Sequence, residues 1–310
     1  MVTLKAILNN YDDIHRRLVQ YTMKKGYITT EEFLEKFVVF TERCGYLDEH
    51  QVQNLHRINE KEKRDIFVNL MRVLNGQLDH IGLRIVEVFD EHQEGVAYVT
   101  LITTCPSNDI FEKMSGLSNA EVALFNVWLD MMCTSADGQI LLIDALEAAV
   151  ELPHKISQKR AQELIDQLIA EQWLSMAQDG EALHLSVHAL AQMQADLMSR
   201  FPLKTCVHCK NCIVIIDHAL HCDACDAYLH RHCAQSVLML AMQVLNCFHH
   251  MPRYVFRRKN SCSRLRRNVR SGILKCPGRD GRCETIFDEH LATANHSRDE
   301  IGRPTDVSST

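Results

Sequence analysis

The sequence predicts an α+β protein in which two domains of helices and a β-hairpin precede a small zinc-bound module. Three observations support this prediction. Patterns typical of helices and then of a hairpin occur twice, in the same order, before residue 203. Cysteines and histidines gather beyond residue 205 at spacings typical of metal chelates. The chain has 310 residues, 46% of them hydrophobic, which is enough for two or three domains with cores of their own.

The first domain is expected over residues 1–105. Its clearest local signal is Thr29 followed by Glu32, a capping box that opens a helix. The expected elements are helices at 13–26, 29–38 and 66–74, then strands at 83–89 and 96–102. Helices followed by a hairpin are typical of a winged helix.

The second domain is expected over residues 106–202 and repeats this order. Ser118 and Glu121 form another capping box at the start of its first helix. The expected elements are helices at 118–132, 157–172 and 190–198, with strands at 173–177 and 182–185 ahead of the last helix. The sequence therefore predicts tandem winged helices.

Winged helices often bind DNA, but the fold alone does not establish that use. The helix after the first turn carries the acidic residues Glu31, Glu32, Glu35 and Glu42, which would repel phosphates. The helix at 157–172 mixes both signs of charge, as an ordinary solvated surface does. We expect both domains to contact protein.

Composition limits the cellular compartment and the class of ligand that we expect for the protein. The longest apolar run, near residues 237–245, is too short to span a bilayer, and the N-terminal segment lacks the apolar core of a signal peptide. Cysteines clustered with histidines indicate metal in a reducing compartment, so the nucleus or the cytosol is expected. The net charge is −6, yet residues 251–275 hold nine Lys or Arg and no acid. Most of the chain is therefore too acidic to bind polyanions.

Three chelating pairs stand close together beyond residue 205. They are Cys209 with Cys212, Cys222 with Cys225, and His230 with Cys233, in the spacing C-x2-C-x9-C-x2-C-x4-H-x2-C. Because each pair supplies two ligands and tetrahedral zinc needs four, three pairs imply two ions and a fourth pair downstream. Sites filled by four protein ligands leave no position for water, so a structural role is expected.

Cys206 makes the first pair ambiguous, since Cys206 with Cys209 is as acceptable a chelate as Cys209 with Cys212. We expect the second pairing, because residues 213–216 can then form a strand that leads away from the metal. Cys206 would then be a free thiol beside the site. The remaining nearby histidines are expected at the surface or behind the ligands; they are His208, His218, His221 and His232.

The fourth pair has two candidates. Cys247 with His250 keeps a two-residue gap and is separated from Cys233 by 13 residues, so spacing alone favours it. Cys276 with Cys283 lies farther along the chain and has six residues between its cysteines.

Tandem winged helices followed by four cysteines, one histidine and three cysteines resemble the family of non-structural maintenance of chromosomes element 1. This family is the RING-like subunit of the SMC five-six genome-maintenance complex. The resemblance covers most of residues 10–235 and rests on the pattern from Cys209 to Cys233, the hairpin at 83–102 and the strand start at Trp173. It favours Cys276, which Pro277 follows, and Cys283 as the last pair.

The resemblance also implies a cross-braced zinc domain at residues 203–290. One ion would be held by Cys209, Cys212, His230 and Cys233, and the other by Cys222, Cys225, Cys276 and Cys283. Modules of this type usually present an apolar residue between their first two ligands, whereas this pairing leaves Lys210 and Asn211 there. A basic insert at about 237–274 has no counterpart in the family pattern. It is either a real loop or translated intron sequence, and a disordered tail is expected at 291–310.

The function implied is that of a RING-type ubiquitin ligase subunit in DNA repair and recombination, located in the nucleus. The module would hold a ubiquitin-conjugating enzyme, no residue of the chain would carry ubiquitin, and the winged helices would bind a MAGE-type partner among the other SMC five-six subunits. Residues 253–275 could add weak nucleic-acid contact.

Two alternatives remain. The same ligand order occurs in plant homeodomain fingers, which suggests a non-enzymatic adaptor or chromatin reader, although Leu274 stands where such fingers carry tryptophan. A DNA-binding regulator built on the winged helices would require a basic recognition face, which the sequence does not show.

Overall fold

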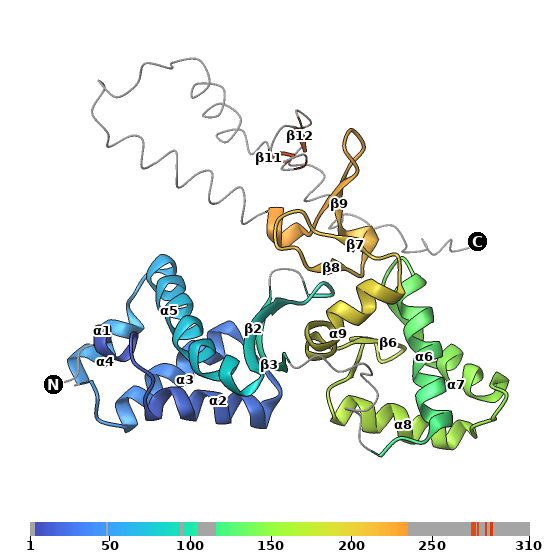
Figure 1. The fold of residues 1–310 in the computed structure, drawn as a ribbon, viewed down its shortest axis with the longest axis horizontal. Helices are drawn as coiled ribbons and strands as arrows, with labels where there is room; N and C mark the ends of the chain where they lie inside the picture. Colours follow the sequence, from blue (N-terminus) through green and yellow to red (C-terminus); the bar gives the residue numbers. More distant parts are fainter. Residues whose placement is uncertain are drawn as a thin grey trace, which may run out of the picture. The chain divides into compact units, whose positions relative to one another are not determined.

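The computed structural model describes residues 4–47, 49–93, 96–104, 116–234, 274–276, 278, 283 and 286–287. It divides the chain into two compact units, residues 1–203 with 214–216, and residues 204–213 with 217–310 (Figure 1). The expected α+β class is confirmed. No helix in the described part of the chain is long and apolar enough to cross a membrane.

The first winged helix has helices on a three-stranded antiparallel sheet with strand order β1-β3-β2. Its elements are α1 Leu4–Ile7, α2 Asp13–Lys25, β1 Tyr27–Thr29, α3 Thr30–Arg43, α4 Glu49–His56, α5 Glu60–Leu78, a 3-10 turn Asp79–Ile81, β2 Leu83–Phe89 and β3 Ala97–Thr103. The predicted first hairpin strand is confirmed at both ends, and the second begins and ends one residue later than expected.

Side-chain caps explain where these helices begin. The Thr29 hydroxyl accepts the Glu32 N–H at 3.1 Å, as the capping box predicts. The Glu32 carboxylate instead accepts the Tyr21 hydroxyl at 2.5 Å. That tertiary contact joins α3 to α2. The pKa of Tyr21 is raised, first by this hydrogen bond and then by desolvation.

The core of this domain is apolar and aromatic. Phe33 and Phe37 of α3 are almost fully buried, as are Leu70 of α5 and Ile85 of β2. Phe33 meets Phe67 edge to face, with ring centroids 5.9 Å apart. Burial of each such side chain contributes about 1.5–3 kcal/mol, so packing rather than helix propensity holds the helices on the sheet.

The second winged helix repeats the order on a separate core. Its elements are α6 Asn119–Thr134, β4 Gln139–Leu141, α7 Leu142–Glu151, α8 Gln158–Ala170, β5 Leu174–Met176, β6 Ala182–Leu185 and α9 Val187–Arg200, with sheet order β4-β6-β5. Trp128 is fully buried at its centre, and its indole N–H donates to the Ala145 carbonyl at 2.9 Å. The expected tandem winged helices are thus confirmed.

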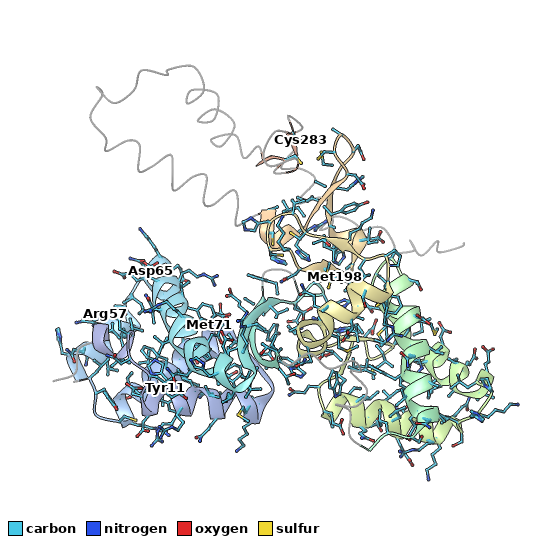
Figure 2. All side chains as sticks on the ribbon, viewed as in Figure 1. Tyr11, Arg57, Asp65, Met71, Met198 and Cys283 are labelled. Atoms are coloured by element: carbon cyan, nitrogen blue, oxygen red, sulfur yellow. The ribbon has the colours of Figure 1, made fainter. Side chains whose placement is uncertain are left out.

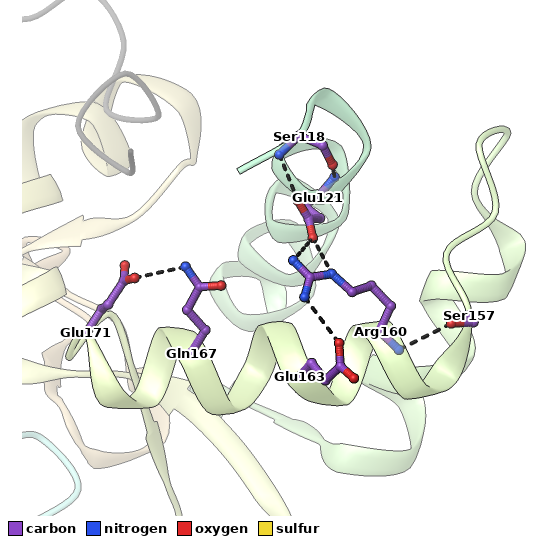
Figure 3. Close-up of polar contacts among 7 residues, drawn as sticks. All are labelled: Ser118, Glu121, Ser157, Arg160, Glu163, Gln167 and Glu171. Carbon is purple, nitrogen blue, oxygen red and sulfur yellow. Dashed lines mark hydrogen bonds and ion pairs between the residues drawn. The ribbon is translucent and has the colours of Figure 1, made fainter. Parts of the chain in front are cut away.

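An ion pair ties α6 to α8 (Figure 3). Ser118 and Glu121 complete the predicted capping box, and the Arg160 guanidinium donates from Nε to the Glu121 carboxylate at 2.7 Å. Burial alone would raise the pKa of Glu121, but hydrogen bonds from Ser118 and Arg160 outweigh it and hold this pKa below its usual value. The carboxylate therefore stays charged against its guanidinium.

The two winged helices meet through polar contacts within the first unit. The Gln172 side chain donates to the Lys25 carbonyl at 2.5 Å, and the Gln192 side-chain oxygen accepts the Thr103 N–H at 2.8 Å. Gly26 has φ of 78°, and a Cβ there would lie 1.4 Å from the Gln172 amide oxygen. The junction therefore requires glycine at this position. Thr100 also lies 2.8 Å from Nδ1 of His188.

In its described residues, the second unit has short strands paired in two-stranded sheets. Its described elements are β7 Lys204–Thr205, β8 Cys212–Ile213, β9 Leu220–Cys222, β10 Ala227–Leu229, β11 Leu274–Lys275 and β12 Ile286–Phe287, and a 3-10 turn spans Ile216–His218. Among the described residues its buried core is made of five cysteines and five aliphatic side chains. So small a core predicts that bound metal supplies much of the folding energy.

Several sequence expectations lie outside the described residues. They are the boundary between the winged helices at residues 105 and 106, the basic insert at 237–274 apart from Leu274, the expected nucleic-acid segment up to residue 273, and the tail at 291–310.

Candidate metal centre

Two groups of four side chains could each hold a metal ion. They are Cys206, Cys209, His230 and Cys233, and Cys222, Cys225, Cys276 and Cys283. Within each group the ligand atoms all lie within 4.8 Å of one another, and three of the four residues are buried. Thiolates and an imidazole at this separation are the donor set of a four-coordinate, structural site.

Both cysteine pairs that open the groups are built on the same backbone turn. The Lys210 N–H donates to the Cys206 carbonyl at 3.0 Å, and Lys210 has φ of 66°. The Asp226 N–H donates to the Cys222 carbonyl at 2.8 Å, and Asp226 has φ of 55°. Left-handed backbone is costly for residues other than glycine, so its use after both pairs indicates a turn maintained to aim two sulfurs at one point.

The first pair differs from the sequence expectation. We expected Cys209 with Cys212, but the structure groups Cys206 with Cys209 and places Cys212 in β8, where it pairs with Thr205 of β7. The reason is the hairpin: the Cys206 N–H donates to the Asn211 carbonyl at 3.0 Å, so residues 206–211 form the turn and Cys212 already belongs to the returning strand. The expected strand at 213–216 accordingly begins at Cys212 and ends at Ile213.

His230 is oriented by a backbone carbonyl. Its Nε2 lies 3.1 Å from the Cys212 carbonyl, while its Nδ1 faces the Cys209 and Cys233 sulfurs at 3.4 and 3.8 Å. A carbonyl can only accept, so Nε2 carries the proton and the lone pair of Nδ1 points into the group of ligands. Cys212 thus contributes its main chain to this site.

The second group joins segments far apart in the sequence. The Cys222 sulfur lies 3.7 Å from that of Cys283, and the Cys225 sulfur lies 3.6 Å from that of Cys276. Figure 2 shows Cys283 beside the β9–β10 hairpin. The structure therefore brings the expected last pair together with Cys222 and Cys225, and the competing Cys247 and His250 lie outside the described residues.

A close backbone approach completes this group. The Gly278 N–H donates to the Cys276 sulfur at 3.3 Å. A Cβ on Gly278 would lie 2.5 Å from the Cys225 sulfur and 2.8 Å from the Ala227 Cβ. Only glycine therefore fits at residue 278 without moving a ligand.

The thiols of the second group require a cation to ionise together. Burial raises the pKa of Cys276 to about 12, and burial followed by the Cys222 thiol raises the pKa of Cys225. Without a cation, these two thiols would stay largely protonated at neutral pH. A bound cation reverses this preference, so metal binding would release protons from the group.

Two other histidines considered from the sequence belong to neither group. His221 contacts Asp223 and Asp226 at 3.2 and 2.8 Å and stacks on Tyr228, and His232 stacks on His230 at 4.7 Å between ring centroids. These positions agree with the expected supporting roles. Cys206 is the one member of the two groups that was not expected as a ligand, although the two residues between it and Cys209 are the spacing of a chelating pair.

The order of the ligands interleaves the two groups. The first and third pairs along the chain form one group, and the second and fourth form the other. This is the cross-braced arrangement expected from the resemblance, with Cys206 in place of Cys212. All four positions are supplied by the protein in each group, which suits a scaffold rather than hydrolytic chemistry.

Comparison with known proteins agrees with this architecture. No protein-family profile and no curated protein matches the chain. Among solved structures, a chain of the "Nse1-Nse3-Nse4 complex" matches with a TM-score of 0.57 and 21% identity, covering 74% of this chain and 92% of that one. The protein thus shares the fold of a chain of the Nse1-Nse3-Nse4 complex.

Proposed function

We propose that this chain is a RING-type ubiquitin ligase subunit of the SMC five-six complex that acts in DNA repair and recombination in the nucleus. The observation that carries the proposal is the interleaved pair of four-ligand groups at the end of a tandem winged-helix fold. The likeness to a chain of the Nse1-Nse3-Nse4 complex supports it.

The metal that suits both groups is zinc. Thiolates with at most one imidazole, four per ion, are the ligands of structural zinc. We assign one ion to Cys206, Cys209, His230 and Cys233 and the other to Cys222, Cys225, Cys276 and Cys283. Bound zinc would supply folding energy of about 10–16 kcal/mol per site, by analogy with zinc-finger peptides.

Val207 supports contact with a conjugating enzyme. With Cys206 and Cys209 as the first pair, the gap between the ligands holds Val207 and His208. Val207 is half-buried, and its N–H donates to the Tyr228 carbonyl at 2.9 Å, which fixes the backbone. The apolar residue that such modules usually present is therefore in place, and Lys210 falls after the pair.

The proposed mechanism is positioning. The zinc module holds the conjugating enzyme so that its ubiquitin thioester is oriented for attack by a substrate lysine, and this restriction of geometry lowers the barrier. Ubiquitin passes from the conjugating enzyme to the lysine, so no side chain of this chain forms a covalent intermediate.

We further propose that the winged helices bind other subunits, including a MAGE-type partner. The solved complex contains Nse1, Nse3 and Nse4, and the present chain would take the place of Nse1. The acidic surface of α3, with Glu31, Glu35 and Glu42 exposed, favours protein contact over DNA contact. The proposed nucleic-acid contact at 253–275 rests on its basic composition alone.

Discharge of ubiquitin from a charged conjugating enzyme to free lysine tests the proposal. The full chain, with its partner subunits, should accelerate discharge, and Val207→Lys should abolish the acceleration while keeping two zinc ions. The control is Lys210→Ala, because Lys210 is exposed and follows the Cys206–Cys209 pair, and this variant should leave the rate of ubiquitin discharge unchanged.

The adaptor alternative predicts a different result. A chromatin reader would be favoured if the wild-type chain bound histone-tail peptides but did not accelerate ubiquitin discharge from any conjugating enzyme tested. Equal rates for wild type and Val207→Lys would contradict the assigned surface.

A further inference from the structure

A groove of about 470 Å³ lies on the first winged helix between α3, α4 and the start of α5. Its lining combines a row of apolar side chains with a charged edge. The lining includes Leu34, Val38 and Ile58 on the apolar side and Glu31, Glu35 and Lys63 on the charged edge. A volume of this size accommodates a few large side chains.

The floor of the groove is apolar and partly open to solvent. Leu34 and Val38, one turn apart on α3, and Ile58 after α4 are half-buried and pack on the core. Phe37 and Phe67 lie beneath them and are almost fully buried. The groove therefore offers a row of apolar contacts on a rigid base.

The edge of the groove carries two cations that are paired and two carboxylates that are not, among the described residues. Lys63 donates to Glu60 at 2.6 Å, and Arg64 pairs with Glu87 at 2.5 Å, so both cations are engaged. Glu31 and Glu35 are exposed, and neither carboxylate has a hydrogen bond or ion pair within the described ranges.

These two carboxylates repel each other because they stand four residues apart on one helix face. The helix dipole favours Glu31, which lies in the first turn of α3, but its effect fades by Glu35. A basic partner on this edge would relieve the repulsion.

We propose that the groove docks an amphipathic helix of a protein partner. The helix would set apolar side chains at i, i+4 and i+7 on Leu34, Val38 and Ile58, and would place two Lys or Arg residues about one turn apart beside Glu31 and Glu35. This inference rests on the proposed function in one respect, that the winged helices serve protein contact. It does not depend on the metal groups or on ubiquitin transfer.

The probe is a stapled helical peptide of about four turns with leucines at i, i+4 and i+7 and two arginines along one flank. A second peptide carries glutamates in place of the arginines. Affinity for the full chain is measured by fluorescence anisotropy, and contact with the groove by methyl NMR of Leu34 and Val38. The arginine peptide should bind, shift both methyl signals, and bind at least roughly tenfold more tightly than the glutamate peptide.

Glu31→Gln with Glu35→Gln should weaken the arginine peptide by roughly tenfold, since two exposed charge pairs are lost. Glu42→Gln is the matched control, an exposed glutamate of α3 outside the groove, and should leave affinity unchanged. Failure of the arginine peptide to bind, equal affinity for both peptides, or binding without shifts at Leu34 and Val38 would overturn the inference. Ubiquitin discharge by the Gln variants, measured alongside, reports separately on the proposed function.

Discussion

Exchange of Cys206 for serine, set against the same exchange at Cys212, tests the first metal group most directly. The Cys206 sulfur is one of four ligand atoms that lie within 4.8 Å of one another, and the Cys212 side chain belongs to neither group. Both cysteines are buried, with exposures of 0% and 6%, so the two variants are well matched. Only Cys206→Ser should remove a ligand.

The expected magnitude follows from sharing the metal's contribution among its ligands. A structural zinc contributes about 10–16 kcal/mol, so one of four ligands accounts for about 2.5–4 kcal/mol. Since about 1.4 kcal/mol is a factor of ten, Cys206→Ser should weaken the first ion by about two to three orders of magnitude. Cys212→Ser puts a hydroxyl in a buried position and should cost about 1–3 kcal/mol of stability without a change in metal content.

The assay is the ratio of zinc to protein after dialysis against a competing chelator, with folding checked by circular dichroism. We expect two ions in wild type and in Cys212→Ser, and one ion in Cys206→Ser. Two ions retained by Cys206→Ser, with one lost from Cys212→Ser, would refute the reasoning and restore the pairing expected from spacing.

Three further predictions follow from the geometry. Gly278→Ala should release one ion of two, because its Cβ would lie 2.5 Å from a ligand sulfur of the second group; an unchanged zinc ratio would contradict the assigned last pair. Arg160→Ala should lower the free energy of unfolding by about 1–3 kcal/mol, since it leaves a buried carboxylate without its cation. Lys159 is an exposed neighbour that lies 4.0 Å from Glu163, and Lys159→Ala should change the free energy of unfolding by less than about 0.5 kcal/mol. Equal losses for the two variants in chemical denaturation would argue against the ion pair. Acidification should destabilise the first unit, because burial lowers the pKa of His184 and of His188 from the usual 6.5, so the unfolded chain binds more protons below that pH. Thermal melts should show stability complete above pH 6.5 and lost as the pH falls below it, by up to about 1.4 kcal/mol per pH unit for each histidine, whereas a flat profile would exclude this linkage.

The hairpin strands and the capped helix starts were predictable from the sequence, and the short strands β1 and β4 were not. The strand at 83–89 is a seven-residue run rich in β-branched residues, and the Ser118 cap is a purely local signal. β1 and β4 are each three residues long, and they are defined by partners far along the chain, such as Tyr27 opposite Thr100. No local pattern specifies such pairing.

The structure groups the first ligand pair differently from the sequence expectation for a related reason. Three cysteines at equal spacing offer two chelates of the same length, and the choice depends on which residues form the hairpin turn. A glycine after Cys209 would have marked the left-handed turn, but Lys210 occupies that position and conceals it. At Asp226 the same turn carries aspartate, which tolerates left-handed backbone better than lysine does.

The interleaved ligands close chain segments of very different length, so the cost of closing each segment can be compared. Cys209 and His230 are 21 positions apart, whereas Cys225 and Cys276 are 51 apart. The entropy of closing a loop grows only with the logarithm of its length, so the longer span costs less than about 1 kcal/mol more. That penalty is small beside the attraction of a metal for its thiolates, about 10 kcal/mol or more. The sequence between residues 234 and 274 can accordingly lengthen or shorten over evolutionary time at almost no thermodynamic cost, provided that the flanking ligands Cys233 and Cys276 are kept.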